Sequence, residues 1–149
     1  MTNTEKVLSI VVVALVATLI ITGVVLYQMS VVIHTTGQIK AIGVAVYNDA
    51  NGTSPCTSID WGILGPGDLK GVTVYIKNVK NTNATLNIVR NNTIPPTFAP
   101  NSTLAWNYSG QILAPAQQIC TQITLLIDPN IKDIVAFSFD ITIIATEPT

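Results

Sequence analysis

The segment from residue 59 to residue 78, IDWGILGPGDLKGVTVYIKN, contains glycines whose spacing resembles part of a phosphate-binding loop. A phosphate loop needs backbone amides aligned at the start of a helix, with a Lys-Ser/Thr pair beside them. Neither follows Gly65 and Gly67, because the chain runs directly into an alternating strand pattern. Pro66 presets its own φ, and Gly67 can adopt the positive φ of a type II turn. The corner is therefore predicted to be a turn between two strands.

The remaining residues that could do chemistry form no recognisable motif. The one histidine, His34, lacks a second histidine with which to build a common metal site. The aspartates lie mostly at turns, beside Gly, Asn or Pro: Asp49, Asp60, Asp68, Asp128, Asp133 and Asp140. A calcium site without a D-x-D-x-D loop and a two-carboxylate glycosidase site stay open as minor alternatives. We expect no catalytic residue, no metal site and no cofactor.

Charge sets a further bound on function. Only 10% of the 149 residues are charged, the net charge is −1, and 48% are hydrophobic. Without a basic cluster, nucleic acid is not an expected partner.

The hydrophobic excess is concentrated near the N-terminus. Residues 7–27, VLSIVVVALVATLIITGVVLY, carry no charge, and as a helix they would be about 31 Å long, close to the thickness of the hydrocarbon core of a bilayer. A cleaved secretory signal is the rival interpretation, but its apolar core is usually about 7–15 residues long. We therefore expect a polar N-terminus at 1–6, a hydrophobic helix at 7–33 that anchors in lipid or forms a filament core, and a separate domain at 36–149.

Small residues recur along the expected helix at a spacing of four. Ala14, Thr18 and Thr22 form a small-x-x-x-small stripe, which allows membrane helices to approach closely. Chance in a run rich in Ala and Thr explains such a stripe equally well. If the stripe is functional, it predicts association between helices.

Signals for export lie entirely after the hydrophobic run. Five Asn-x-Ser/Thr triplets, which are candidates for glycosylation, begin at Asn51, Asn83, Asn91, Asn101 and Asn107. Polar turn residues are the plainer explanation for any one of them. Together they favour an extracellular domain.

The two cysteines, Cys56 and Cys120, also follow the hydrophobic run. In an exported domain the simplest expectation is one disulfide between them. The alternative is a pair of reduced thiols. In the strand QQICTQITLLID (117–128), Cys120 lies on the face opposite Ile119 and Ile123, so a bridge would attach the Cys56 loop to the outside of that strand.

Past residue 36 the hydrophobic pattern has a period of two. We expect an all-β fold of about seven antiparallel strands, arranged as a single Ig-like β-sandwich behind the one N-terminal hydrophobic α-helix. The predicted strands lie at 38–49, 57–61, 69–78, 84–90, 102–110, 118–127 and 134–144. Inward positions include Ile42 and Val44 in the first strand and Val135 and Phe137 in the last.

The order TGQIKAIGVAVYND, IDWGILGPGDLKGVTVYIKN, LAWNYSG and FSFDITI resembles that of small archaeal cell-surface proteins. Archaeal type IV pilins are similar in pairing a hydrophobic helix with a β-sandwich. The chain departs from the pilins at the processing site, because Lys6 is followed by Val7. TasA/camelysin fibre proteins and archaeal donor-strand threads are similar in the PGD…N strand entry, which implies that residues 38–47 either complete their own sheet or are lent to a neighbour.

These features favour a non-enzymatic structural protein of the cell surface, a subunit of an extracellular filament or envelope assembly. Its expected partners are itself, through helix–helix and strand-edge contacts, and membrane lipid. The alternative is a monomeric, membrane-anchored binding or adhesion module, or an accessory subunit of a membrane complex. That alternative predicts an exposed apolar or aromatic patch, for example around Trp61 or Phe98.

Overall fold

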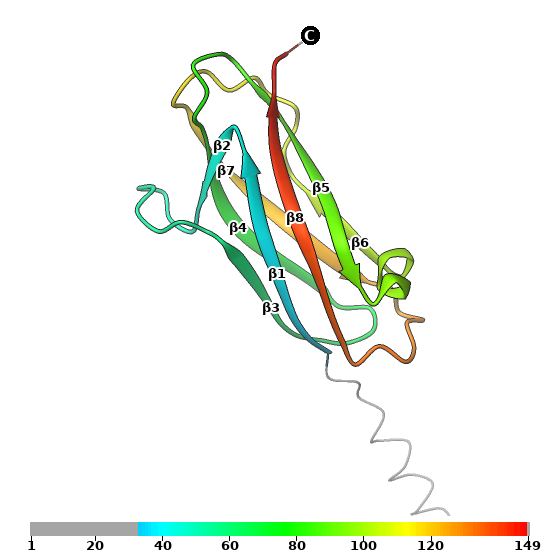
Figure 1. Ribbon diagram of the computed structural model, residues 1–149. Helices are drawn as coiled ribbons and strands as arrows, with labels where there is room; N and C mark the ends of the chain where they lie inside the picture. Colours follow the sequence, from blue (N-terminus) through cyan, green and yellow to red (C-terminus); the bar gives the residue numbers. More distant parts are fainter. Residues whose placement is uncertain (1–32, 149) are drawn as a thin grey trace, which may run out of the picture. The chain divides into compact units, whose positions relative to one another are not determined.

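The computed structural model describes residues 33–148, with side chains from residue 36 onward. These residues form eight strands and one short 3-10 helix, arranged as in Figure 1. Their bounds are β1 Ile33–Ile42, β2 Val44–Tyr47, β3 Ser58–Leu64, β4 Leu69–Asn78, β5 Thr85–Ile94, η1 Pro96–Asn101, β6 Ser102–Trp106, β7 Gln118–Ile127 and β8 Ala136–Thr146. The all-β class predicted from the sequence is confirmed for these residues.

The strands form two sheets of four. Sheet A has the order β3-β1-β8-β5, and sheet B has the order β2-β4-β7-β6. This unit has a proximal end and a distal end. The proximal end is where β1 begins, and it carries the β3–β4 turn, η1 and the β7–β8 connection; it is the lower end in Figure 1. The distal end carries the β4–β5 turn and the β6–β7 connection.

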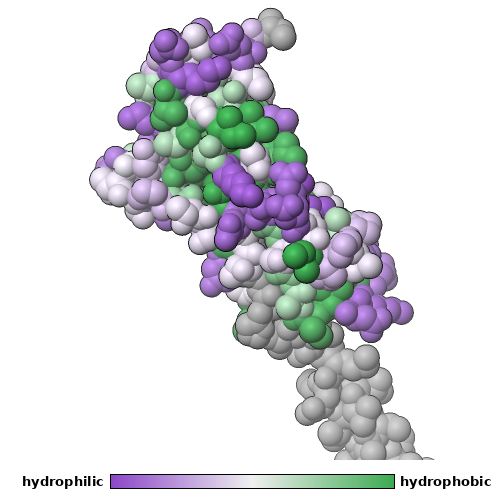
Figure 2. Space-filling view, in the orientation of Figure 1, coloured by the Kyte–Doolittle hydropathy of each residue, from purple (hydrophilic) through white to green (hydrophobic). Residues whose placement is uncertain are grey.

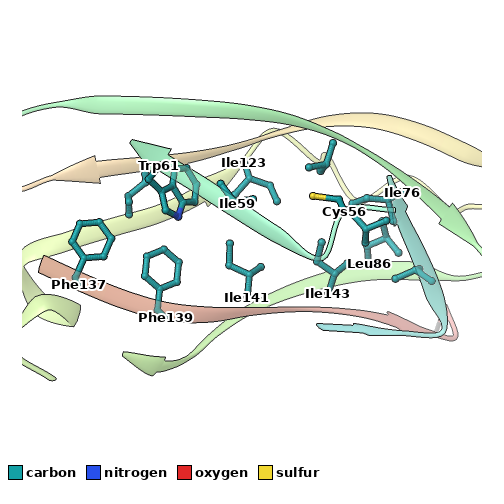
Figure 3. Close-up of a cluster of buried hydrophobic side chains, with 14 of the residues drawn as sticks. Cys56, Ile59, Trp61, Ile76, Leu86, Ile123, Phe137, Phe139, Ile141 and Ile143 are labelled. Carbon is teal, nitrogen blue, oxygen red and sulfur yellow. The ribbon is translucent and has the colours of Figure 1, made fainter. Parts of the chain in front are cut away.

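The core lies between the two sheets and is built from alternate residues of each strand. Figure 3 shows Phe137, Phe139, Ile141 and Ile143 of β8 pointing into the core, toward side chains that include Ile123 of β7 in the opposite sheet. At the proximal end Phe98 of η1 stacks on Phe137, with 3.6 Å between ring centroids. Regular alternation with β-branched and aromatic residues thus produces two buried faces, which must pack on each other to leave water.

The first predicted strand is divided in the structure. Gly43, at φ +73°, passes the chain from β1 in sheet A to β2 in sheet B. This change explains why there are eight strands where about seven were expected. It also overturns one predicted core position, because Ile42 is exposed whereas Val44 is buried. Alternation counted through Gly43 failed because the backbone changes sheets there.

The pairing of β1 is a second correction. All strands were expected to be antiparallel, but β1 runs parallel to β8 over nine register positions, from His34↔Ala136 to Ile42↔Ile144. On its other side β1 pairs antiparallel with β3. Segments 38–42 and 44–47 both pair with strands of their own chain. This pairing agrees with the expectation that residues 38–47 complete their own sheet, and not with the alternative that they are lent to a neighbour.

Predicted strands with uninterrupted alternation were placed well. The predicted ranges 69–78 and 118–127 coincide with β4 and β7. The last strand begins at Ala136, so Val135, which was predicted to face the core, lies before it and is exposed.

The predicted hydrophobic helix lies almost wholly outside the described residues, as do Ala14, Thr18 and Thr22. Its expected last residue, Ile33, is the first residue of β1. Among residues 33–148, no helix combines the length and the apolar character needed to cross a membrane.

Candidate functional site

The glycine corner is a turn that joins the two sheets. Gly67 has φ +83°, the Asp68 amide donates to the Gly65 carbonyl, and the Asp68 carboxylate accepts from the Gly65 amide at 2.7 Å. This is the predicted type II geometry, closed by the side chain of Asp68. No helix follows the corner, because β4 begins at Leu69.

Several other aspartates bond to the backbone of their own loops. Asp60 accepts from the amide of Gly62, and Asp128 accepts from that of Asn130. Asp49 accepts from the hydroxyl of Thr53 and from the amide of Ser54, and these hydrogen bonds lower its pKa. Carboxylates committed in this way shape turns. Within the part of the chain that the structure describes, no three His, Cys, Asp or Glu side chains gather where they could hold a metal ion.

Asp140 of β8 instead forms a cross-strand contact on the outer face of sheet A. Its carboxylate accepts from Lys40 Nζ at 2.8 Å and from Asn92 Nδ2 at 2.7 Å. The hydrogen bond from Lys40 is the main cause that lowers the pKa of Asp140, followed by that from Asn92. The contact joins β1, β8 and the β5 edge on a face that is otherwise poor in charge.

The predicted disulfide does not form: Cys56 and Cys120 are free thiols in the structure. Register explains why. Across sheet B, Cys120 lies beside Tyr75, Tyr75 beside Tyr47, and Tyr47 beside Pro55. Three strand spacings of about 4.8 Å place Pro55, the neighbour of Cys56, about 14 Å from Cys120, whereas a disulfide needs Cα atoms within about 7 Å.

The two thiols also face opposite sides of the sheet. Cys56 points into the core, as Figure 3 shows, and burial raises its pKa. Cys120 is exposed on the outer side of β7, on the face predicted from the alternation. The prediction failed because Pro55 carries Cys56 to the far edge of β2, with its side chain turned inward.

The five sequon asparagines differ in what their side-chain amides do. Asn51, Asn83 and Asn107 are exposed, and Asn107 uses its Oδ1 atom to accept from Thr121 and the Gln122 amide. Asn91, although exposed, donates through Nδ2 to Thr142, and half-buried Asn101 donates through Nδ2 to the Thr97 carbonyl. A glycan is attached at Nδ2, so the last two asparagines would have to give up a hydrogen bond.

The aromatic patch expected around Trp61 or Phe98 is not present. Both side chains are fully buried, with 0% of their surface exposed. Strand β3 places Trp61 inward, and η1 folds Phe98 across the proximal end of the core. The apolar surface that a binding module needs is therefore not supplied by these aromatics.

Sequence reasoning missed Asn78, the last residue of the VYIKN segment. It is fully buried, and its Nδ2 atom lies within hydrogen-bonding distance of the carbonyls of Thr82, Leu113 and Ala114. Its Oδ1 atom accepts from the Lys80 amide. A polar residue at an inward position of an alternating strand was the available signal, and its role is to join the β4–β5 and β6–β7 connections at the distal end.

Arg90 was also missed. It occupies an inward position of β5, donates to Ser102 Oγ and to the Ala99 carbonyl at 2.8 Å each, and lies over the Phe139 ring. Burial lowers its pKa. The side chain links sheet A to η1 and β6 across the open side between the sheets.

The feature with the clearest bearing on function is the placement of β1. The strand that follows the hydrophobic run lies inside sheet A, between β3 and β8, and the sheet edges are formed by β3, β5, β2 and β6. No model of a known protein family and no curated protein sequence matches this chain.

Proposed function

We propose that this protein is a non-enzymatic structural protein of the cell surface, a subunit of an extracellular filament or envelope assembly. In this proposal, the hydrophobic run 7–27 anchors it in lipid or in a filament core, and an Ig-like sandwich extends outside. The observation that carries the proposal is the position of β1, which directly follows the hydrophobic run and is bonded on both sides.

Such a strand is suited to transmitting tension. β1 pairs at six positions with β3 and at nine with β8, over Ile33–Ile42. A pull along β1 loads the hydrogen bonds of both ladders together, because these bonds run across the direction of force. An edge strand would be held by one ladder only. A domain tethered through an interior strand therefore resists extraction from its anchor.

The outer face of sheet B suits close packing between subunits. Its exposed or half-exposed residues include Tyr75, Thr73, Gln122 and Thr124, and the one charged side chain at the outward positions of β4 and β7 is Lys77, near the distal end of β4. Such a face can approach a neighbour while desolvating little charge.

Among the open edges, β3 is best suited to strand-edge association. It has seven residues and carries no sequon. By contrast, β2 has four residues, β5 carries the Asn91 sequon, and β6 lies between the Asn101 and Asn107 sequons. An exposed strand edge without a covering group is a template for pairing. We therefore assign self-association to β3.

Negative-stain electron microscopy of native cell surfaces and of the purified full-length protein tests this proposal. We expect ordered arrays or filaments. A lysine at Ser58 on the β3 edge (Ser58→Lys) should reduce assembly, while the matched change Ala105→Lys on the β6 edge, which leaves both neighbouring sequons intact, should not. Dispersed monomers that co-purify with a stoichiometric partner would instead support an anchored binding or accessory module.

A further inference from the structure

The proximal end of the domain carries an apolar rim. Eight large hydrophobic side chains are exposed among the residues whose side chains the structure describes, and five of them lie at this end. We define the proximal rim as Ile63, Leu69, Ile94, Leu126 and Val135, which are between 43% and 71% exposed. Figure 2 shows hydrophobic surface at the lower end of the domain, where β1 begins.

The rim is not an unfinished part of the core. Leu64, Phe98, Ile127 and Ile134 already seal the core at this end, and each is at most 5% exposed. The rim residues lie outside this seal, at the termini of separate elements. Leu69 and Leu126, for example, are cross-strand partners on the outer face of sheet B. Side chains of this size remain in water only at a cost unless something covers them.

Charge at this end does not favour a strongly charged partner. Lys70 and Lys132 stand against Asp68, Asp128 and Asp133, which gives a formal sum of −1. Two of the acids are turned onto their own turns, Asp68 onto the Gly65 amide and Asp128 onto the Asn130 amide. Apolar side chains interspersed with polar turns are suited to an interface between water and hydrocarbon.

The length of chain outside the structure identifies the occupant. Only residues 28–32 separate the hydrophobic run 7–27 from Ile33, the first residue of β1. Six residue steps of about 3.4 Å span at most about 20 Å. The polar layer of a bilayer is about 5–8 Å deep on each side. If the run spans the membrane, the proximal end is held within reach of the lipid headgroups.

We propose that the proximal rim lies in the interfacial layer of the lipid bilayer, so that the domain rests on the membrane through these five side chains. The inference depends on the anchor in the proposed function. It adds a second, reversible lipid contact that fixes the tilt of the domain on its tether. The matching surface at the distal end, which includes Ile42 and Val79, faces away from the membrane.

The test uses the full-length protein in phosphatidylcholine vesicles that contain lipid carrying a doxyl group either at headgroup level, to report on the rim, or deep in the acyl chain, to report on the anchor. Single cysteines carry a bimane fluorophore in a Cys120→Ser background, where Cys56 is buried and is not labelled. Rim positions are Ile63→Cys and Val135→Cys. The matched controls are Ile42→Cys and Val79→Cys, which are 56% and 58% exposed at the distal end. Ile20→Cys, within the run, reports on the anchor itself.

We expect headgroup-level doxyl groups to reduce the rim fluorescence at least twofold and to leave the distal labels unchanged. Quenching at Ile20→Cys without quenching at the rim would overturn the inference and leave the anchor in place. Absence of quenching at Ile20→Cys would refute the proposed anchor, and with it the inference that depends on the anchor. If pyrene labels at the rim form excimers between copies and lipid does not quench the rim labels, the rim is covered by a second copy of the chain and not by lipid. That result would overturn the inference.

Discussion

Gly37 of β1 lies directly against the indole of Trp61, so that a Cβ atom on Gly37 would sit 3.3 Å from Trp61 Nε1 and 3.2 Å from the Phe139 carbonyl oxygen. The absence of a side chain at Gly37 allows β1 to pass close to a fully buried tryptophan. The strand that connects the domain to the hydrophobic run is thus fitted to the core at a position where a Cβ atom would force its neighbours to shift.

Gly37→Ala should therefore destabilise the domain by about 1–3 kcal/mol, because neither the strand backbone nor the packed indole can move freely. Urea unfolding followed by tryptophan fluorescence measures the change. Gly71→Ala is the matched control, since its added Cβ meets the exposed side chain of Gln122, which can swing away. A loss in Gly71→Ala equal to that in Gly37→Ala would show that the indole contact is not the cause.

Trp61 Nε1 is buried and has no hydrogen-bond partner among the described residues, so Trp61→Phe removes an unsatisfied donor along with apolar area. We expect Trp61→Phe to cost clearly less than the roughly 3–5 kcal/mol of Trp61→Ala. The smaller ring should also relieve Gly37→Ala, making the double variant less destabilised than the sum of the two single ones. Additive changes in the free energy of unfolding would contradict the contact.

Asn78→Ala should cost about 3 kcal/mol, because it leaves buried carbonyls and the Lys80 amide without their partner. Hydrogen exchange should report loss of protection in the 79–84 and 113–117 connections. Asn81→Ala, at an exposed position of the same turn, is expected to change stability by less than about 0.5 kcal/mol. Unchanged exchange in the 113–117 connection of Asn78→Ala would refute the proposed link.

Thiol reactivity distinguishes the two cysteines. Cys120 is exposed and should react promptly with a thiol reagent in the native protein. Cys56 is buried and its pKa is raised, so it should react only after unfolding. Intact mass of the purified protein before and after reduction checks the same point. A loss of two hydrogens per monomer, restored by reductant, would reveal an intramolecular bridge and contradict this geometry.

Acid should weaken the contribution of Asp140. Its pKa in the folded state lies below the ordinary value of 3.8, so the folded protein binds this proton less readily than the unfolded chain. The stabilisation is therefore complete above about pH 5 and is lost as the pH falls through the folded-state pKa.

Asp140→Asn tests this directly, with Asp133→Asn at an exposed turn position as the control; both variants are made in a host that does not glycosylate, because Asp140→Asn creates an Asn-Ile-Thr triplet. The Tm of Asp140→Asn should be lower than that of the unmodified protein at pH 7, and the gap should narrow as the pH falls below the ordinary aspartate pKa of 3.8. A gap that stays constant across this range would assign the effect to packing instead of charge.

The β pattern, the turn at Pro66–Gly67 and most inward positions of β4, β7 and β8 followed from the sequence, because side-chain alternation and turn propensity are local properties. Pairing partners are not local. Only the tertiary structure could place β1 parallel to β8, turn Ile42 outward after the switch at Gly43, and hold Cys56 three strands from Cys120. The alternation of one strand specifies which side of it is apolar, whereas the neighbour that covers that side is chosen by the packing of the whole chain.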